Sequence, residues 1–333
     1  MNGKVVGAGL ILVAAFLFSV PARAADMDSI LQYGGLTRDY IVHTPPQYKS
    51  DGGPVLPVVL ALHGGGGSAQ GMKEMYGLDA YADRAGMIMV YPDAIPSAIG
   101  SFHTCNAGGC CGPAKKEGVD DTGFIAAVVD AVVSTYHADA KHVFVTGHSN
   151  GAMMAYRLAC EIPGKIAAIA PVSGQSVFPC PQTSPVPVLH IHGTLDICAL
   201  YSGGLCGGCF ADALGLPGAD KKWPCEGVQK SLARRAQSYG CGAGMETVFT
   251  RGPVDCERWK GCPDSGTVAL CSVRGGGHHW QGARLPEACE KKPGSEFCRR
   301  WLNEVGPVLG GVDYGGIIFD FFSDQVQRFP ASR

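Results

Sequence analysis

The chain has 333 residues, of which 46% are hydrophobic, so it is expected to fold around a sizeable core rather than remain disordered. Its 27 basic and 29 acidic side chains leave a formal net charge of −2. No basic stripe stands out, which argues against nucleic acid as a partner. The sequence shows neither an internal repeat nor a linker between two halves, so we expect a single domain over residues 25–333.

The N-terminal segment has the features of a secretory signal peptide. Lys4 precedes an apolar run from Val5 to Val20, and Ala22-Arg23-Ala24 forms an A-x-A cleavage signal. A membrane anchor is the alternative, but the run is shorter than the roughly 20 residues that a spanning helix needs. We therefore predict a signal peptide over residues 1–24. The mature protein should be secreted, to the periplasm or outside the cell, with no membrane association after cleavage.

The region that follows alternates short apolar runs with segments of helical periodicity. Buried strands are predicted at residues 57–62, 87–92, 142–146, 166–172, 186–191 and 268–273. Helices are predicted at residues 73–85, at 121–136 with Asp121 as the N-cap, at 152–159 and at 317–327. This alternation favours an α/β fold with a mostly parallel central sheet and helices on both faces.

A G-x-S-x-G pentapeptide, Gly147-His148-Ser149-Asn150-Gly151, lies between the predicted strand 142–146 and the helix 152–159. A serine at a strand-to-helix turn with flanking glycines is typical of the nucleophile elbow of α/β-hydrolases. The sequence therefore predicts an α/β-hydrolase fold with Ser149 as the nucleophile. His148 is expected to pack beside Ser149, next to the substrate pocket, without acting as the base.

Serine needs a base, and the base needs an orienting acid, which follow the nucleophile in the order acid then histidine in this fold. Asp196 comes just after the strand 186–191, and His278 follows the strand 268–273 in the run Gly275–Trp280. Both are expected at the carboxyl ends of strands, where open α/β sheets place their chemistry. Spacing alone does not separate His278 from its neighbour His279.

Other candidates for these roles fit less well. Asp212, Asp220 and Asp255 also precede the histidine pair, but none follows a buried strand. His190 and His192 lie in or at the end of an apolar strand and are interpreted as buried supporting groups.

A tetrahedral intermediate also needs hydrogen-bond donors for its oxyanion. One donor is expected to be the backbone amide of Asn150, the residue after the nucleophile. The other is expected from the glycine run that follows His63, which matches an HGGG-type loop, and we assign it to Gly65. This chemistry requires neither a metal nor an organic cofactor.

The chain resembles the secreted α/β-hydrolase esterase family that includes polyhydroxybutyrate depolymerases and bacterial feruloyl esterases. The resemblance runs from about Tyr40 to Phe322. It rests on the segments Leu62–Gly65, Asn106–Pro113, Val119–Ile125, Gly147–Glu161, His190–Asp196 and Gly275–Gly282. In that family the histidine directly after the glycines is the catalytic one, which implies His278 rather than His279. The family also implies Asp196 as the acid.

Two features depart from the family pattern, and both concern the substrate. Gln281 replaces the usual proline after Trp280, a residue that we expect either to line the acyl pocket or to pack beneath its loop. The stretch Cys198–Cys225 is rich in glycine and cysteine and fits no sheet element. We interpret it as an insertion near the active-site face, held by disulfides.

All 15 cysteines follow the predicted cleavage site. In an oxidising compartment they are expected to form disulfides, with at least one left unpaired because the number is odd. Cys206-x-x-Cys209 could suggest zinc, but the partner spacings of a structural zinc site are absent. Short spacing suggests the pairs Cys256–Cys262 and Cys289–Cys298. Cys241–Cys271 could join a helix end to the last strand, and Cys160–Cys180 could brace the helix after Ser149.

The sequence therefore predicts a secreted serine carboxylic ester hydrolase that acts through an acyl-enzyme. The resemblance implies a hydroxyalkanoate oligomer or polymer, or an aromatic ester of the plant cell wall, as the substrate. An acyltransferase or a peptidase could use the same triad, and a non-catalytic binding protein could keep the fold.

Overall fold

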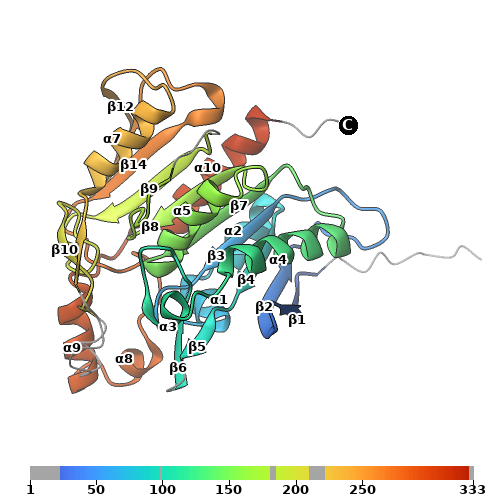
Figure 1. Ribbon diagram of the computed structural model, residues 1–333, viewed down its shortest axis with the longest axis horizontal. Helices are drawn as coiled ribbons and strands as arrows, with labels where there is room; N and C mark the ends of the chain where they lie inside the picture. Colours follow the sequence, from blue (N-terminus) through green and yellow to red (C-terminus); the bar gives the residue numbers. More distant parts are fainter. Residues whose placement is uncertain (1–22, 98–99, 181–184, 210–221, 330–333) are drawn as a thin grey trace, which may run out of the picture.

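The computed structural model describes residues 23–97, 100–180, 185–209 and 222–329, so the predicted signal peptide lies almost wholly outside the described residues. The centre of the fold is a ten-stranded sheet in the order β1-β2-β4-β3-β7-β8-β9-β14-β13-β12 (Figure 1). In chain order these strands are β1 (Ala25–Tyr33), β2 (Leu36–Thr44), β3 (Val58–Leu62), β4 (Ile88–Pro92), β7 (Val143–His148), β8 (Ala168–Val172), β9 (Val188–Gly193), β12 (Met245–Arg251), β13 (Val254–Trp259) and β14 (Val268–Val273).

The six central strands, β4 to β14, are parallel, as the apolar runs predict. Their buried positions alternate between the two faces of the sheet: Val143 and Val145 of β7 pack into one core, and Phe144 packs into the other. The outer pairs β1–β2 and β12–β13 are antiparallel. These four strands were not predicted from the sequence. In β1 and β12, all side chains are exposed or half-buried and show little apolar periodicity.

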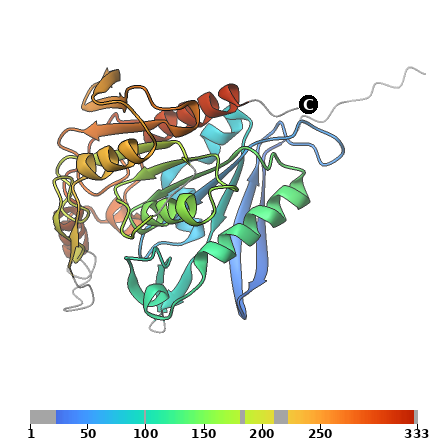
Figure 2. The ribbon, with the colours of Figure 1, turned by 45° about the horizontal axis from the view of Figure 1, so that its top comes forward.

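Helices cover both faces of the sheet (Figures 1 and 2). Helices α4 (Asp121–Tyr136), α5 (Asn150–Glu161) and α7 (Val228–Ser238) contribute to one core. The other core contains residues of α1 (Ala69–Tyr76), α2 (Asp79–Ala85) and α10 (Tyr314–Arg328). The shorter elements are α3 (Gly112–Lys116), α8 (Glu287–Lys291), α9 (Glu296–Val305), the 3-10 turn Asp264–Gly266, and the hairpins β5 (Ile95–Ser97)–β6 (Gly100–Thr104) and β10 (Gly204–Cys206)–β11 (Trp223–Cys225).

Two local predictions were wrong. The single helix predicted over residues 73–85 is two helices, because Gly77 takes a left-handed conformation (φ +61°) that ends α1. The N-cap of α4 is Asp120, whose side chain accepts a hydrogen bond from the Gly123 amide, rather than Asp121. The carboxylate of Asp121 is buried and pairs with Arg38 at 2.8 Å.

Seven disulfides join cysteines of the described residues, and Cys105 is unpaired and buried. Two predicted pairs, Cys160–Cys180 and Cys289–Cys298, are confirmed. The other two predictions were wrong because they exchanged partners: the structure pairs Cys256 with Cys271 and Cys241 with Cys262. Cys256 and Cys271 face each other on neighbouring antiparallel strands, a register that sequence spacing does not reveal. The remaining bonds are Cys110–Cys111, Cys198–Cys209 and Cys206–Cys225.

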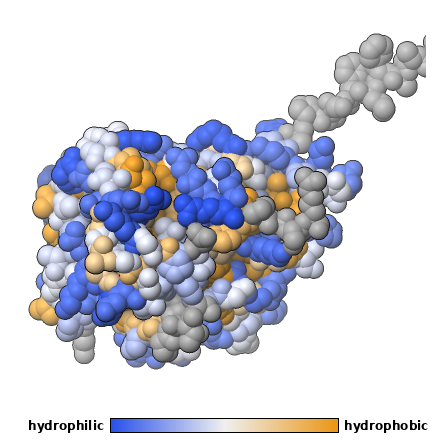
Figure 3. All heavy atoms as spheres, turned by 90° about the horizontal axis from the view of Figure 1, so that it is seen from above, coloured by the Kyte–Doolittle hydropathy of each residue, from blue (hydrophilic) through white to orange (hydrophobic). Residues whose placement is uncertain are grey.

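The surface carries no large apolar sector on the face shown in Figure 3, where hydrophilic residues predominate and hydrophobic ones form scattered groups. Within the described part of the chain, no helix is long and apolar enough to cross a membrane.

Candidate active site

The G-x-S-x-G segment forms a sharp turn between β7 and α5. Ser149 has φ +55° and ψ −114°, a strained conformation for a residue with a side chain. The flanking glycines allow the turn to pack closely against the end of β3. A Cβ atom on Gly151 would lie 2.2 Å from the Leu62 carbonyl oxygen, and one on Gly147 would lie 2.6 Å from the Gly151 carbonyl carbon. The serine side chain is thereby held at the carboxyl end of the sheet.

The structure brings Ser149, His278 and Asp196 together. His278 Nε2 lies 2.8 Å from Ser149 Oγ, and His278 Nδ1 lies 2.8 Å from Asp196 Oδ2. Asp196 and His278 are buried, with exposed fractions of 3% and 1%. These contacts connect a hydroxyl, an imidazole and a carboxylate in the order that nucleophilic acyl transfer uses.

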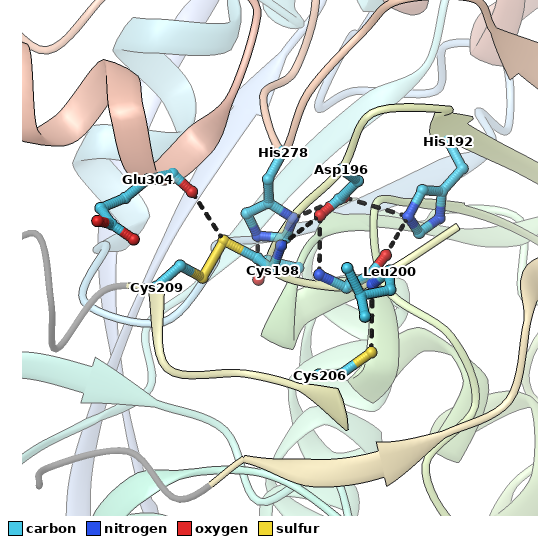
Figure 4. The surroundings of a disulfide bond; sticks show 10 residues. His192, Asp196, Cys198, Leu200, Cys206, Cys209, His278 and Glu304 are labelled. Atoms are coloured by element: carbon cyan, nitrogen blue, oxygen red, sulfur yellow. Dashed lines mark hydrogen bonds and ion pairs between the residues drawn. A yellow bond between two sulfur atoms is a disulfide. The ribbon is translucent and has the colours of Figure 1, made fainter. Parts of the chain in front are cut away.

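Asp196 is surrounded by hydrogen-bond donors (Figure 4). Its Oδ1 accepts the backbone N–H groups of Cys198 and Ala199, each at 2.8 Å, and its Oδ2 faces His278 and His192. Burial alone would raise the pKa of this carboxyl. The charge of His278 and the hydrogen bonds from His192 and His278 outweigh burial and hold the pKa far below its usual range. The carboxylate is therefore ionised at neutral pH.

The alternative residues lie elsewhere. His279 packs edge-on against Trp301 with ring centroids 5.4 Å apart, and its Nδ1 has no hydrogen-bond partner among the described residues. Burial, with a smaller effect of His278, lowers the pKa of His279 to about 4. Asp255, an alternative candidate for the acid, forms an ion pair with Arg274. The other two candidates, Asp212 and Asp220, lie outside the described residues.

The two expected oxyanion donors, Gly65 and Asn150, line the same pocket as Ser149 and His278. Within the described chain, neither of their amides donates a hydrogen bond to another backbone carbonyl. Asn150 is fixed by its side chain, which exchanges two hydrogen bonds with the Cys105 backbone at 2.8 and 3.0 Å.

The glycine loop that contains Gly65 is supported by a partly buried polar cluster that was not predicted from the sequence. Gly66 N–H donates to the His103 carbonyl at 2.8 Å. Asp93 Oδ1 lies 3.2 Å from His63 Nε2 and 2.7 Å from His103 Nδ1. Asp93 thus connects the loop to the β5–β6 hairpin. The histidine of the HGGG motif was the only sequence signal for this cluster.

A pocket of about 60 Å³ opens beside Ser149. Besides the four residues already placed there, its lining consists of Thr104, Cys111, Gly112, Met153, Cys198, Ala199, Gly207, Gly208, Cys209 and Trp223. The disulfides Cys110–Cys111 and Cys198–Cys209 therefore contribute to its wall. Trp223 also lines a larger hollow of about 560 Å³, together with Phe178, Glu226, Arg234 and Arg235.

For Trp280, the structure agrees with the second of the two expected places, beneath the loop rather than in the pocket wall. Trp280 is 2% exposed and packs edge-on against Tyr76 with centroids 4.9 Å apart, so it lies in the core beneath the loop. His148 lies beside His278 with ring centroids 5.1 Å apart, and its Nδ1 is 3.1 Å from the Tyr76 hydroxyl. Burial lowers the pKa of His148 well below its usual value, so this ring is neutral.

Comparison with known proteins identifies the family. The profile described as Esterase PHB depolymerase matches residues 39–192. The protein NocK of Nocardia uniformis subsp. tsuyamanensis, which is designated an esterase, is 32% identical over 270 residues, covering 76% of this chain and 73% of NocK. The chain belongs to this esterase family. It is a serine carboxylic ester hydrolase of the polyhydroxybutyrate depolymerase and feruloyl esterase type.

Other similar proteins are more distant or larger. Feruloyl esterase B of Piromyces equi is 27% identical over 72% of this chain, but the match spans only 42% of that protein. The solved acetyl xylan esterase from Aspergillus awamori superposes with a TM-score of 0.55 at 16% identity, over 84% of this chain and 99% of that structure. This similarity confirms the predicted α/β-hydrolase fold.

Proposed function

We propose that this esterase acts through a Ser149–His278–Asp196 triad. Ser149 Oγ attacks the ester carbonyl while His278 Nε2 accepts its proton, and His278 then returns that proton to the departing alcohol. Asp196 orients the imidazole and stabilises the imidazolium. Water attacks the acyl-enzyme in the second half of the reaction, with His278 again as the base. The observation that carries this proposal is the pair of 2.8 Å contacts that His278 makes to Ser149 and Asp196.

The Gly65 and Asn150 amides serve as the oxyanion donors in this proposal. Both lie in the Ser149 pocket, and Asn150 N–H begins α5, whose positive dipole end favours a developing negative charge. We assign the whole reaction to one catalytic domain over residues 25–333, with 198–225 as an insertion beside the active site. The disulfides and the sequence of residues 1–24 support an exported enzyme.

The size of the pocket favours a small acyl group. Its volume of about 60 Å³ is far below the roughly 300–1,000 Å³ of pockets that enclose drug-sized ligands. An acetyl group is small enough for such a site, whereas a feruloyl group would need the wall at Trp223 to move. The neighbouring hollow of about 560 Å³ is large enough for the alcohol part of a carbohydrate ester. We therefore propose acetylated carbohydrate as the substrate class, in line with the acetylxylan esterases among the relatives.

The triad is tested with Ser149→Ala. We expect kcat for p-nitrophenyl acetate to fall by about 10⁴-fold or more, and labelling by a fluorophosphonate probe to disappear, while the circular dichroism spectrum is unchanged. Retained hydrolysis by this variant would refute the proposal. A hydrolysis panel of acetylated xylo-oligosaccharide, methyl ferulate and hydroxybutyrate oligomer tests the substrate class, and a higher kcat/KM for methyl ferulate would contradict the small acyl group.

A further inference from the structure

Behind the triad carboxylate lies a buried row of three polar side chains that the proposed chemistry does not use. His190 and His192 are two residues apart on β9, so they point to the same face of the sheet, toward Tyr156 on α5. All three are nearly inaccessible, with exposed fractions of 1%, 0% and 2%. Burying three polar groups is costly unless each finds a partner, so the hydrogen bonds of the row must be accounted for.

The row forms one continuous chain of contacts that ends at the triad acid. Tyr156 Oη lies 2.9 Å from His190 Nδ1, and His190 Nε2 lies 2.9 Å from His192 Nδ1. His192 Nε2 lies 2.7 Å from the Ala199 carbonyl oxygen and 3.1 Å from Asp196 Oδ2. Figure 4 shows the last step, where His192 faces the turn that carries Asp196.

The acceptors at the end of this row of contacts determine which ring nitrogens carry protons. A carbonyl oxygen and a carboxylate can only accept, so His192 Nε2 must carry a proton. A neutral imidazole has one N–H, so His192 Nδ1 accepts from His190 Nε2–H, and His190 Nδ1 in turn accepts from the Tyr156 hydroxyl. Burial lowers the pKa of His190 and raises that of Tyr156, which keeps both groups neutral. Every hydrogen bond of the row therefore points toward Asp196.

We propose that His192, held in a single tautomer by His190 and Tyr156, is the positioning residue for the triad acid. This inference rests on the proposed triad. The Nε2–H group of His192 faces two acceptors in the turn that carries Asp196: the Ala199 carbonyl oxygen and Asp196 Oδ2. Ala199 N–H in turn donates to Asp196 Oδ1, so the plane of the carboxylate is fixed from both sides. Outer partners of this kind keep a catalytic group oriented and tune its charge.

Other titratable groups around this pair do not replace the contact. The ring of Tyr201 lies edge-on to His192 with centroids 5.9 Å apart, but its hydroxyl bonds to Ser272. Tyr314 and His148 affect the neighbouring charges only at a distance. Among the described residues, His192 and His278 are therefore the side chains whose ring nitrogens contact the Asp196 carboxylate.

The test compares His192→Leu with His192→Gln. In His192→Leu we expect kcat to fall about 10- to 100-fold, with KM changed less than about twofold, because substrate binding is untouched. Loss of a donor leaves more negative charge on the Asp196 carboxylate, which faces the base. The acid limb of the kcat/KM profile should therefore move to higher pH by about half a unit. His192→Gln keeps a side-chain N–H and should recover part of kcat and of the pH shift.

Two further variants complete the test. Tyr156→Phe removes only the far donor and should lower kcat by about two- to fivefold. His142→Gln is the matched control, because His142 is also a buried histidine but pairs with Asp139 at the other end of β7; its kcat should be unchanged.

Three outcomes would overturn the proposal. One is a kcat within twofold of the wild-type value in folded His192→Leu. Another is a loss of kcat with an unmoved acid limb and no recovery in His192→Gln, which would indicate a purely structural role. If His192→Leu does not fold, a wild-type kcat in both His192→Gln and Tyr156→Phe would have the same consequence. A failure of the triad itself would appear separately, as activity in Ser149→Ala.

Discussion

At the scale of single residues, the two adjacent histidines show how environment assigns chemistry. His278 and His279 follow the same glycine run, and both are buried. Only His278 reaches Ser149 and Asp196, whereas His279 faces Trp301 and burial lowers its pKa to about 4. The two histidines lie in a bend after β14, where one ring enters the site while the other packs against α9.

This difference predicts unequal effects on kcat in two alanine variants. His278→Ala should lower kcat by about 10⁴-fold or more, and it should also lower the melting temperature because the ring is buried. His279→Ala should keep kcat within about fivefold but lower the free energy of unfolding by roughly 1–3 kcal/mol, because it removes buried packing. Steady-state kinetics and thermal denaturation measure the two effects. Full activity in His278→Ala with loss in His279→Ala would reverse the assignment of the base.

At the scale of elements, the segment between β9 and β11 combines a catalytic and a binding role. Asp196 begins it, and Gly207, Gly208 and Cys209 line the pocket further along. The disulfide Cys198–Cys209 connects these two parts, and Cys198 Sγ also lies 3.3 Å from the Glu304 carbonyl oxygen of α9 (Figure 4). The disulfide therefore ties the acid turn to the pocket wall.

Removing this disulfide should affect activity as well as stability. In the double variant Cys198→Ala/Cys209→Ala we expect kcat/KM to fall roughly tenfold or more, because small displacements at a reacting centre are costly. The matched control is Cys256→Ala/Cys271→Ala, which removes a second buried disulfide, across β13 and β14. Both variants should lose about 2–4 kcal/mol of stability, but the control should keep its kcat/KM. Equal losses of activity in the two would show that the Cys198–Cys209 bond has no special role.

The elements also differ in how far the sequence predicts them. The central strands are buried on both faces, so their apolar runs are continuous and visible. The hairpin β12–β13 is exposed along much of its length and carries no such run. The two wrong disulfide predictions also concern this region. The correct partners of Cys256 and Cys271 depend on the register between β13 and β14, which the sequence does not show.

The candidate site was more predictable than the pocket around it. The elbow, the acid and the base are each marked by a local pattern at a strand end, and the structure brings those residues together. No local pattern marked Trp223 as a pocket residue, because its position depends on how the cysteine-rich segment folds back toward Ser149. The link from His192 to Asp196 was also hidden, since an alternating His-x-His on an apolar strand is compatible with many buried arrangements.

At the scale of the whole molecule, the burial of neutral histidines makes stability depend on pH. Burial lowers the pKa of His148 and His190 well below the usual value of 6.5, and that of His279 to about 4. In the unfolded chain these histidines take up protons once the pH falls below about 6.5, whereas in the folded protein they do not. The unfolded state then binds more protons, so acid favours unfolding. The lowered pKa of Asp196 adds to this effect at still lower pH, since its carboxylate is protonated first in the unfolded chain.

We therefore expect the melting temperature to be nearly constant above pH 7 and to fall steadily between pH 6.5 and 4.5. Each histidine that stays neutral in the folded state contributes a slope of roughly 1.4 kcal/mol per pH unit in this range. The variant His279→Phe keeps a ring against Trp301 but has no proton to bind in either state. Its unfolding free energy, measured by urea titration, should fall less steeply than that of the wild type between pH 6.5 and 4.5, and the two curves should become parallel again below pH 4. Identical slopes would mean that His279 binds its proton equally well in the folded and unfolded chains, and that its burial does not contribute to acid sensitivity.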